Sequence, residues 1–159
     1  MTFDPRDELR RLLHLAEVTL AARLRPTKAG GDYDSIRGKY EDRLFDAFMS
    51  YLQSGNRSAR GAAGRAVVEA VPAAFEIGIE DGGGDKDDID PEDSAWATAQ
   101  QGAQVDYLGG VFDWLKDLRA NDTATEDMIQ GRVEMWLGTL DGIYSEGRLR
   151  GMRNEKCYF

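Results

Sequence analysis

The residue types that most often carry catalysis are sparse in this 159-residue chain. His14 is the only histidine and Cys157 the only cysteine, and neither has a sequence partner suited to nucleophilic catalysis. A single cysteine also excludes an internal disulfide, and it cannot hold a metal alone. No glycine-rich loop of the P-loop or dinucleotide-binding type occurs. The sequence therefore predicts a protein without catalytic, cofactor-binding or metal-binding residues.

An acidic, glycine-rich segment at residues 80–90 is the main candidate for a metal site. It contains five aspartates and three consecutive glycines, and carboxylate oxygens are the ligands that calcium prefers. An EF-hand loop counted from Asp85 places Ile89 at the fifth ligand position, and one counted from Asp88 places Ala99 where glutamate is required. We therefore expect this segment to be a mobile, metal-free loop.

The net charge of −9 is concentrated in the middle of the chain. Residues 76–126 contain 14 Asp and Glu against 3 Lys and Arg, a net charge of −11, whereas residues 1–60 carry +2. Because binding to nucleic acid requires clustered Lys and Arg, this distribution argues against a nucleic-acid partner. No run of about 18 apolar residues or secretory signal occurs, so we expect no membrane span and synthesis in the cytoplasm.

Three helices are predicted before the acidic segment. The first covers residues 4–26 and begins with an Asp-Pro start signal, and a linker follows at residues 26–34. A second helix covers residues 35–55. A third, rich in alanine, covers residues 58–71, and Pro72 breaks or kinks it before one or two further turns.

Two more helices follow the acidic segment. Asp90 and Pro91 repeat the start signal and open a helix that continues to about Ala120. The residues from Thr123 to Glu126 form a capping box, after which a 3.6-residue apolar period continues to Gly147. The predicted fold is all-α: a single domain over residues 1–159, forming an irregular bundle of four or five helices with a mobile acidic loop rich in Gly and Asp.

The last predicted helix carries two pairs of glycines, each pair spaced four residues apart. The pairs are Gly138 with Gly142 and Gly147 with Gly151. Each glycine costs a helix about 1 kcal/mol relative to alanine, so we expect close packing to compensate, either within the bundle or against a partner. With Trp136, a residue type enriched at interface hot spots, these glycines form a candidate interface.

Four features of the sequence occur in a characteristic order. A segment Arg-Leu-Phe-Asp-Ala-Phe-Met (43–49) precedes an alanine-rich helix that ends in Ala-Phe-Glu-Ile-Gly-Ile (74–79). The acidic loop and its Asp-Pro-Glu-Asp helix start come next, then Arg-Val-Glu-Met-Trp (132–136) and Tyr-Ser-Glu-Gly-Arg-Leu-Arg-Gly (144–151). From residue 35 to residue 159 the chain thus resembles the helical portion of phage minor head proteins, the head-morphogenesis family related to the F protein of phage Mu.

The resemblance implies a non-enzymatic structural or assembly protein of a phage. It would contact the portal, the capsid or other copies of itself through helices, first in the host cytoplasm and then in the virion head. Many members continue into a small cysteine-containing module, so we expect this chain, which reaches only Cys157 of it, to be a fragment or to lack the module. Two alternatives stay open: an acidic phage-encoded inhibitor or regulatory protein that mimics nucleic acid with residues 76–126, and a head-to-tail adaptor.

Overall fold

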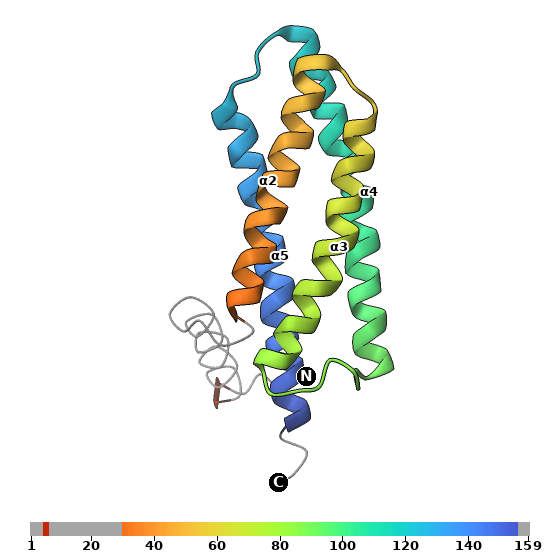
Figure 1. The fold of residues 1–159 in the computed structure, drawn as a ribbon, viewed down its shortest axis with the longest axis vertical. Helices are drawn as coiled ribbons and strands as arrows, with labels where there is room; N and C mark the ends of the chain where they lie inside the picture. Colours follow the sequence, from red (N-terminus) through yellow and green to blue (C-terminus); the bar gives the residue numbers. More distant parts are fainter. Residues whose placement is uncertain (1–4, 7–29, 156–159) are drawn as a thin grey trace.

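The computed structural model describes residues 5–6 and 30–155, and all regular secondary structure in these residues is helical (Figure 1). Its four long helices are α2 (Gly30–Ser54), α3 (Ser58–Asp81), α4 (Pro91–Asn121) and α5 (Glu126–Glu155). Successive helices run in opposite directions along the long axis (Figure 1), which gives an up-down-up-down bundle. The predicted all-α fold is confirmed for these residues. Apart from residues 5–6, the helix predicted over 4–26 lies outside the described part of the chain.

The start of α2 differs from the prediction, because residues 30–34 of the expected linker are helical. Contacts with α5 explain this extension. The ring of Tyr33 stacks on that of Tyr144 with the centroids 4.1 Å apart, and its hydroxyl donates a hydrogen bond to Asp141. Arg37, one turn further, donates a hydrogen bond from Nε to the same carboxylate at 2.9 Å. These long-range contacts hold a helical turn that the glycines in its sequence disfavour locally.

The other boundaries lie close to their predicted positions. α3 is one helix through Pro72, so the predicted break at that residue is wrong, and the helix ends at Asp81, a residue predicted to lie in the acidic loop. α4 begins as predicted, with the Asp90 carboxylate accepting a hydrogen bond from the backbone N–H of Glu92 at 2.8 Å. α5 begins two residues later than a helix capped by Thr123 would, and the hydroxyl of Thr125 accepts the N–H of Met128 at 3.3 Å.

Glycines bring the backbones of α3 and α5 into direct contact. A Cβ atom at Gly147 would lie 2.5 Å from the carbonyl oxygen of Phe75 and 3.2 Å from the Cα of Gly78. A Cβ at Gly151 would overlap the carbonyl oxygen of Ile79, and one at Gly78 would overlap the carbonyl oxygen of Tyr144. Only glycine permits an approach this close, so these residues make α3 and α5 the central pair of the bundle.

The remaining helices arrange themselves around this pair. α3 packs against α2, α4 and α5, and α2 also contacts both α4 and α5, whereas α4 and α5 have no extensive contact with each other. The fully buried side chains include Leu44, Phe48, Phe75, Ile79, Leu115 and Leu140. The four helices therefore surround one core, but α4 and α5 are separated along the side of the bundle where they face each other. None of the described helices is long and apolar enough to span a membrane.

Candidate functional site

The separation of α4 and α5 leaves a groove of about 480 Å³. Its lining residues recur at intervals of three and four along each helix, so each set shares one helix face. They are Gln104, Tyr107, Gly110, Val111 and Trp114 from α4, and Arg132, Met135, Trp136 and Thr139 from α5. We call this set the α4–α5 groove. Trp136, which belongs to the interface predicted from the sequence, thus lies in the groove and is largely buried there.

Two arginine–tryptophan contacts bridge the helices on either side of Gln104. The guanidinium carbon of Arg132 lies 4.3 Å from the ring centroid of Trp114, and that of Arg150 lies 4.7 Å from the centroid of Trp96. The two tryptophans are 18 positions apart, and so are the two arginines. Eighteen positions make five helical turns, about 27 Å. Two cation–π contacts between α4 and α5 thus lie on either side of Gln104, one involving Trp114 and the other Trp96.

The bridge at Arg150 is reinforced by ion pairs. Arg150 pairs with Asp93, whose side chain is almost wholly buried, and its Nε donates to Glu146 Oε1 at 3.0 Å. Arg153 Nη2 lies 3.8 Å from the same Asp93 carboxylate. A buried carboxylate needs such partners because its desolvation is costly. The N-terminal end of α4 is thus joined to the C-terminal end of α5 by ion pairs as well as by the contact between Arg150 and Trp96.

Large apolar side chains stand exposed at the mouth of the groove. The exposed fractions of Tyr107 and Met135 are 63% and 65%. Tyr, Trp, Met and Arg are enriched at protein–protein interfaces, and a contiguous exposed patch of such residues usually marks a binding surface. The groove combines all four residue types and contains no set of groups arranged for acid–base or nucleophilic chemistry.

The floor of the groove contains a polar group without a partner. Gln104 is only 7% exposed, and its carboxamide forms no hydrogen bond with any residue in the described part of the chain. Its amide atoms are not among the fully buried atoms that lack a partner, so water in the open groove can reach them. A molecule that covers the groove excludes this water, and it must then offer the amide a hydrogen bond or leave it unsatisfied at a cost of about 1–3 kcal/mol.

The four glycines predicted as an interface separate into two environments. Gly147 and Gly151 are buried against α3, so they pack within the chain. Cβ atoms at Gly138 and Gly142 would meet nothing within 4 Å, and both residues are exposed. They lie three and seven positions after Met135, on the solvent-facing side of the groove wall. Only this second pair is available to a partner.

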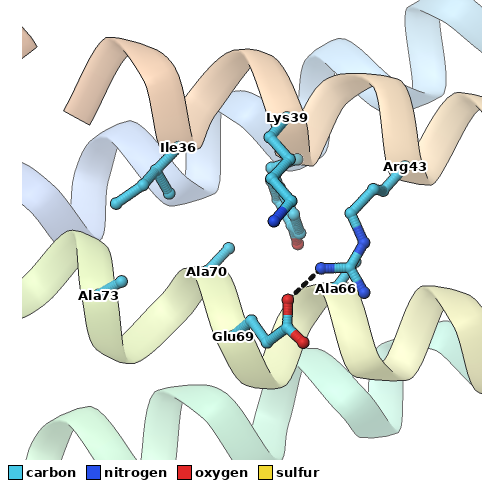
Figure 2. Close-up of a pocket in the computed structure, with 8 residues that line it drawn as sticks. Ile36, Lys39, Arg43, Ala66, Glu69, Ala70 and Ala73 are labelled. Atoms are coloured by element: carbon cyan, nitrogen blue, oxygen red, sulfur yellow. Dashed lines mark hydrogen bonds and ion pairs between the residues drawn. The ribbon is translucent and has the colours of Figure 1, made fainter. Parts of the chain in front are cut away.

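A smaller hollow lies between α2 and α3 (Figure 2). Its volume is about 210 Å³, and Ala66, Ala70 and Ala73 line its α3 side. The ion pair between Arg43 and Glu69 spans it from one helix to the other (Figure 2). Small-molecule sites usually measure about 300–1,000 Å³. We interpret this hollow as a packing gap left by small side chains.

Hydrogen bonds of two tyrosines join α5 to the start of α2 and to the end of α3. The hydroxyl of Tyr144 donates a hydrogen bond to Asp81 at the end of α3, and Arg148 Nη1 donates to that hydroxyl at 3.5 Å. Burial, together with the bond to Asp81, raises the pKa of Tyr144 to about 12. Burial and the bond to Asp141 likewise raise the pKa of Tyr33. Both phenols are therefore neutral at neutral pH and act as structural hydrogen-bond donors.

Residues 82–90 of the acidic segment form short turns between α3 and α4. Asp85 accepts the backbone N–H of Asp87 at 2.9 Å, and Lys86 lies 3.8 Å from the Glu80 carboxylate. Among the residues that the structure describes, no three potential ligands of the His, Cys, Asp and Glu type form a group that could hold a metal ion. That the segment is mobile and metal-free stays a prediction.

Comparisons with protein-family models, with curated proteins and with solved structures give no match. Function is therefore inferred from the α4–α5 groove and from the sequence features described above.

Proposed function

We propose that this protein acts by binding another protein through helical contacts in the α4–α5 groove, and that it catalyses no reaction. The open aromatic surface of the groove is the observation that carries the proposal. Tyr107 and Met135 stand exposed above a floor that includes Trp136, and aromatic anchors of this kind dominate the free energy of protein association. The lining residues of α4 span about 15 Å, enough for roughly three turns of a docked helix.

The setting that we propose is the assembly of a phage head, with a portal or capsid protein as the partner. The resemblance to phage minor head proteins supports this setting. One of its segments, residues 132–136, supplies Arg132, Met135 and Trp136 to the groove. The segment that resembles the assembly family and the exposed apolar surface thus coincide on α5.

An acidic inhibitor is the second candidate. Asp106, Asp113 and Asp117 are exposed and recur on one side of α4, so they have the fixed spacing that a mimic of nucleic acid requires. Competition with a DNA duplex for the target protein distinguishes the two candidates. A DNA duplex should displace the inhibitor from its target, whereas it should leave a complex formed through the groove intact.

The proposal is tested by incorporation into phage particles. The variant carrying Tyr107→Ser and Met135→Ser removes the exposed apolar surface, and Val68→Ser on α3, at a position 45% exposed, is the matched control. We expect the wild-type protein and the control in purified particles or head precursors, detected by mass spectrometry. The double variant should be incorporated at roughly a tenth of that level or less, since hot-spot residues each contribute more than about 1 kcal/mol.

Two results would count against parts of this proposal. Absence of the wild-type protein from both particles and precursors contradicts the phage setting. Equal incorporation of the double variant and the control, with unchanged melting temperatures, contradicts the role of the groove.

A further inference from the structure

Exposed carboxylates flank the α4–α5 groove on the solvent side of both helices. On α4 they recur at intervals of seven and four residues, beside the wall formed by Tyr107 and Trp114. On α5 they are seven residues apart and adjoin Met135. The five acids are Asp106, Asp113 and Asp117 on α4, and Asp127 and Glu134 on α5. We call them the acidic rims.

The acidic rims are not neutralised by the part of the chain that the structure describes. None of the five carboxylates forms an ion pair with a residue in the described part of the structure. Residues 91–139 contain nine Asp and Glu against three Lys and Arg, and one of those three, Arg132, is stacked on Trp114 inside the groove. The surface around the groove is therefore negatively charged, and it attracts a cationic partner.

Across the groove, apolar side chains lie at the centre and acidic side chains lie at the two edges. Tyr107, Met135 and the buried Trp136 form a central apolar strip, and exposed Gly138 and Gly142 leave room beside it for a helix to approach closely. The acidic rims lie outside this strip on both sides. A complementary helix carries one apolar face flanked by Lys or Arg on each side.

A second copy of this chain does not fit the same surface. Two copies of the groove placed face to face would bring acidic rims against acidic rims, and like charges opposed across an interface disfavour association. Gln104 adds a second requirement, because its carboxamide lines the groove without a hydrogen bond to the described residues. An all-apolar helix would seal that amide away from water without satisfying it.

We infer that the α4–α5 groove binds a basic amphipathic helix of another protein, which presents a polar side chain to Gln104. This inference rests on the proposed function and deepens it by defining the chemistry of the partner. The apolar strip supplies the buried contact, the acidic rims select lysine and arginine flanks, and Gln104 fixes the register of the helix in the groove.

The test uses synthetic helices of about 18 residues, the length that spans the ~27 Å between the two arginine–tryptophan contacts. All share one leucine stripe with a central glutamine, and they differ only in having lysine or glutamate flanks. Fluorescence anisotropy of dye-labelled peptides measures binding to the full chain. We expect the lysine-flanked helix to bind about tenfold more tightly at low ionic strength and to lose this preference as salt is added.

Two matched four-site variants test the acidic rims. The first neutralises four rim carboxylates and should abolish the preference for lysine flanks. The second neutralises four exposed carboxylates on α2 and α3 and should retain it. The substitutions are Asp106→Asn, Asp113→Asn, Asp117→Asn and Glu134→Gln in the first variant, and Asp34→Asn, Asp42→Asn, Asp46→Asn and Glu76→Gln in the second.

An exchange of specificity tests the role of Gln104. The wild-type protein should prefer the probe with a central glutamine over the same probe with a central leucine. Gln104→Leu should reverse that preference, by about tenfold in affinity, because the apolar pair no longer buries an unsatisfied amide.

Each remaining outcome overturns the inference. Equal binding of the lysine and glutamate probes, a lysine preference that survives neutralisation of the rims, or no reversal with Gln104→Leu each contradicts it, as does the absence of binding below about 1 mM. Self-association that disappears in the Tyr107→Ser, Met135→Ser variant would make a second copy the occupant. The proposed function is judged separately, by incorporation of that variant into particles.

Discussion

The same substitution at two glycines of α5 should have opposite effects on stability. Gly142 and Gly147 lie five positions apart on one helix, and the first is open to solvent whereas the second touches α3. Alanine at either position gains about 1 kcal/mol of helix propensity. At Gly142 a Cβ meets nothing within 4 Å, so this gain should appear almost in full as a higher free energy of unfolding.

At Gly147 the steric cost outweighs the gain. The added Cβ would lie 2.5 Å from the carbonyl oxygen of Phe75 and 3.3 Å from the backbone nitrogen of Ile79. Backbone atoms cannot rotate away, so α3 and α5 must separate and lose contacts along their crossing. Overpacking of a core costs about 1–3 kcal/mol or more, and an overlap this severe lies at the upper end. The net loss should be about 2 kcal/mol.

Thermal unfolding followed by circular dichroism checks this prediction. For a chain of this size, 1 kcal/mol changes the melting temperature by about 2–4 °C. Gly142→Ala should therefore raise the melting temperature by about 2–4 °C, and Gly147→Ala should lower it by about 4–8 °C. Gly138→Ala is a second control and should behave as Gly142→Ala does. If Gly147→Ala also raises the melting temperature, the close contact of α3 with α5 is not present in solution.

Three further predictions concern charge, pH and capping. Arg150→Ala removes an ion-pair partner of the buried Asp93 carboxylate and should lower the free energy of unfolding by about 3 kcal/mol. Urea denaturation measures this change, and a loss below about 0.5 kcal/mol contradicts the ion pair. The pKa of Tyr144 is raised to about 12 in the folded protein, so its contribution to stability is present below about pH 10 and is lost as the pH rises toward 12. The melting temperature of the wild-type protein should therefore fall over that range, and that of Tyr144→Phe should fall less. Thr125→Ala removes the hydroxyl that caps α5 and should cost about 1 kcal/mol, whereas Thr123→Ala should cost much less; the reverse order would restore the capping box as first predicted.

The helices could be predicted from the sequence because their determinants are local. Asp90 with Pro91 marks the start of α4, and periodic apolar residues mark the buried faces of α2 and α5. The early start of α2 could not be predicted in this way. Its first turn depends on Tyr33 meeting Tyr144, more than a hundred residues away, and a linear pattern of glycines gives no sign of that contact.

The candidate site was only partly predictable. The spacing of four residues within each glycine pair suggested one shared face, yet the step of five from Gly142 to Gly147 rotates the helix by about 140°. The two pairs therefore had to face different surroundings, and the sequence contains that information. The groove itself depends on the close contact of α3 with α5, which leaves α4 apart. Tyr107 and Met135 each follow an acidic residue, Asp106 and Glu134, and a large apolar residue at the edge of a polar face is the local sign that could have indicated an exposed binding surface.

Site-specific crosslinking tests the central claim, that the α4–α5 groove is where this protein binds another. A photo-crosslinking phenylalanine analogue is placed at Tyr107, and the same analogue at Val68 is the control, since both side chains are exposed. Crosslinked peptides from assembling particles are identified by mass spectrometry. We predict crosslinks from position 107, and not from position 68, to a Lys- or Arg-rich helical segment of a different protein. Crosslinks that are equal from the two positions, or that reach only this chain, would contradict the claim.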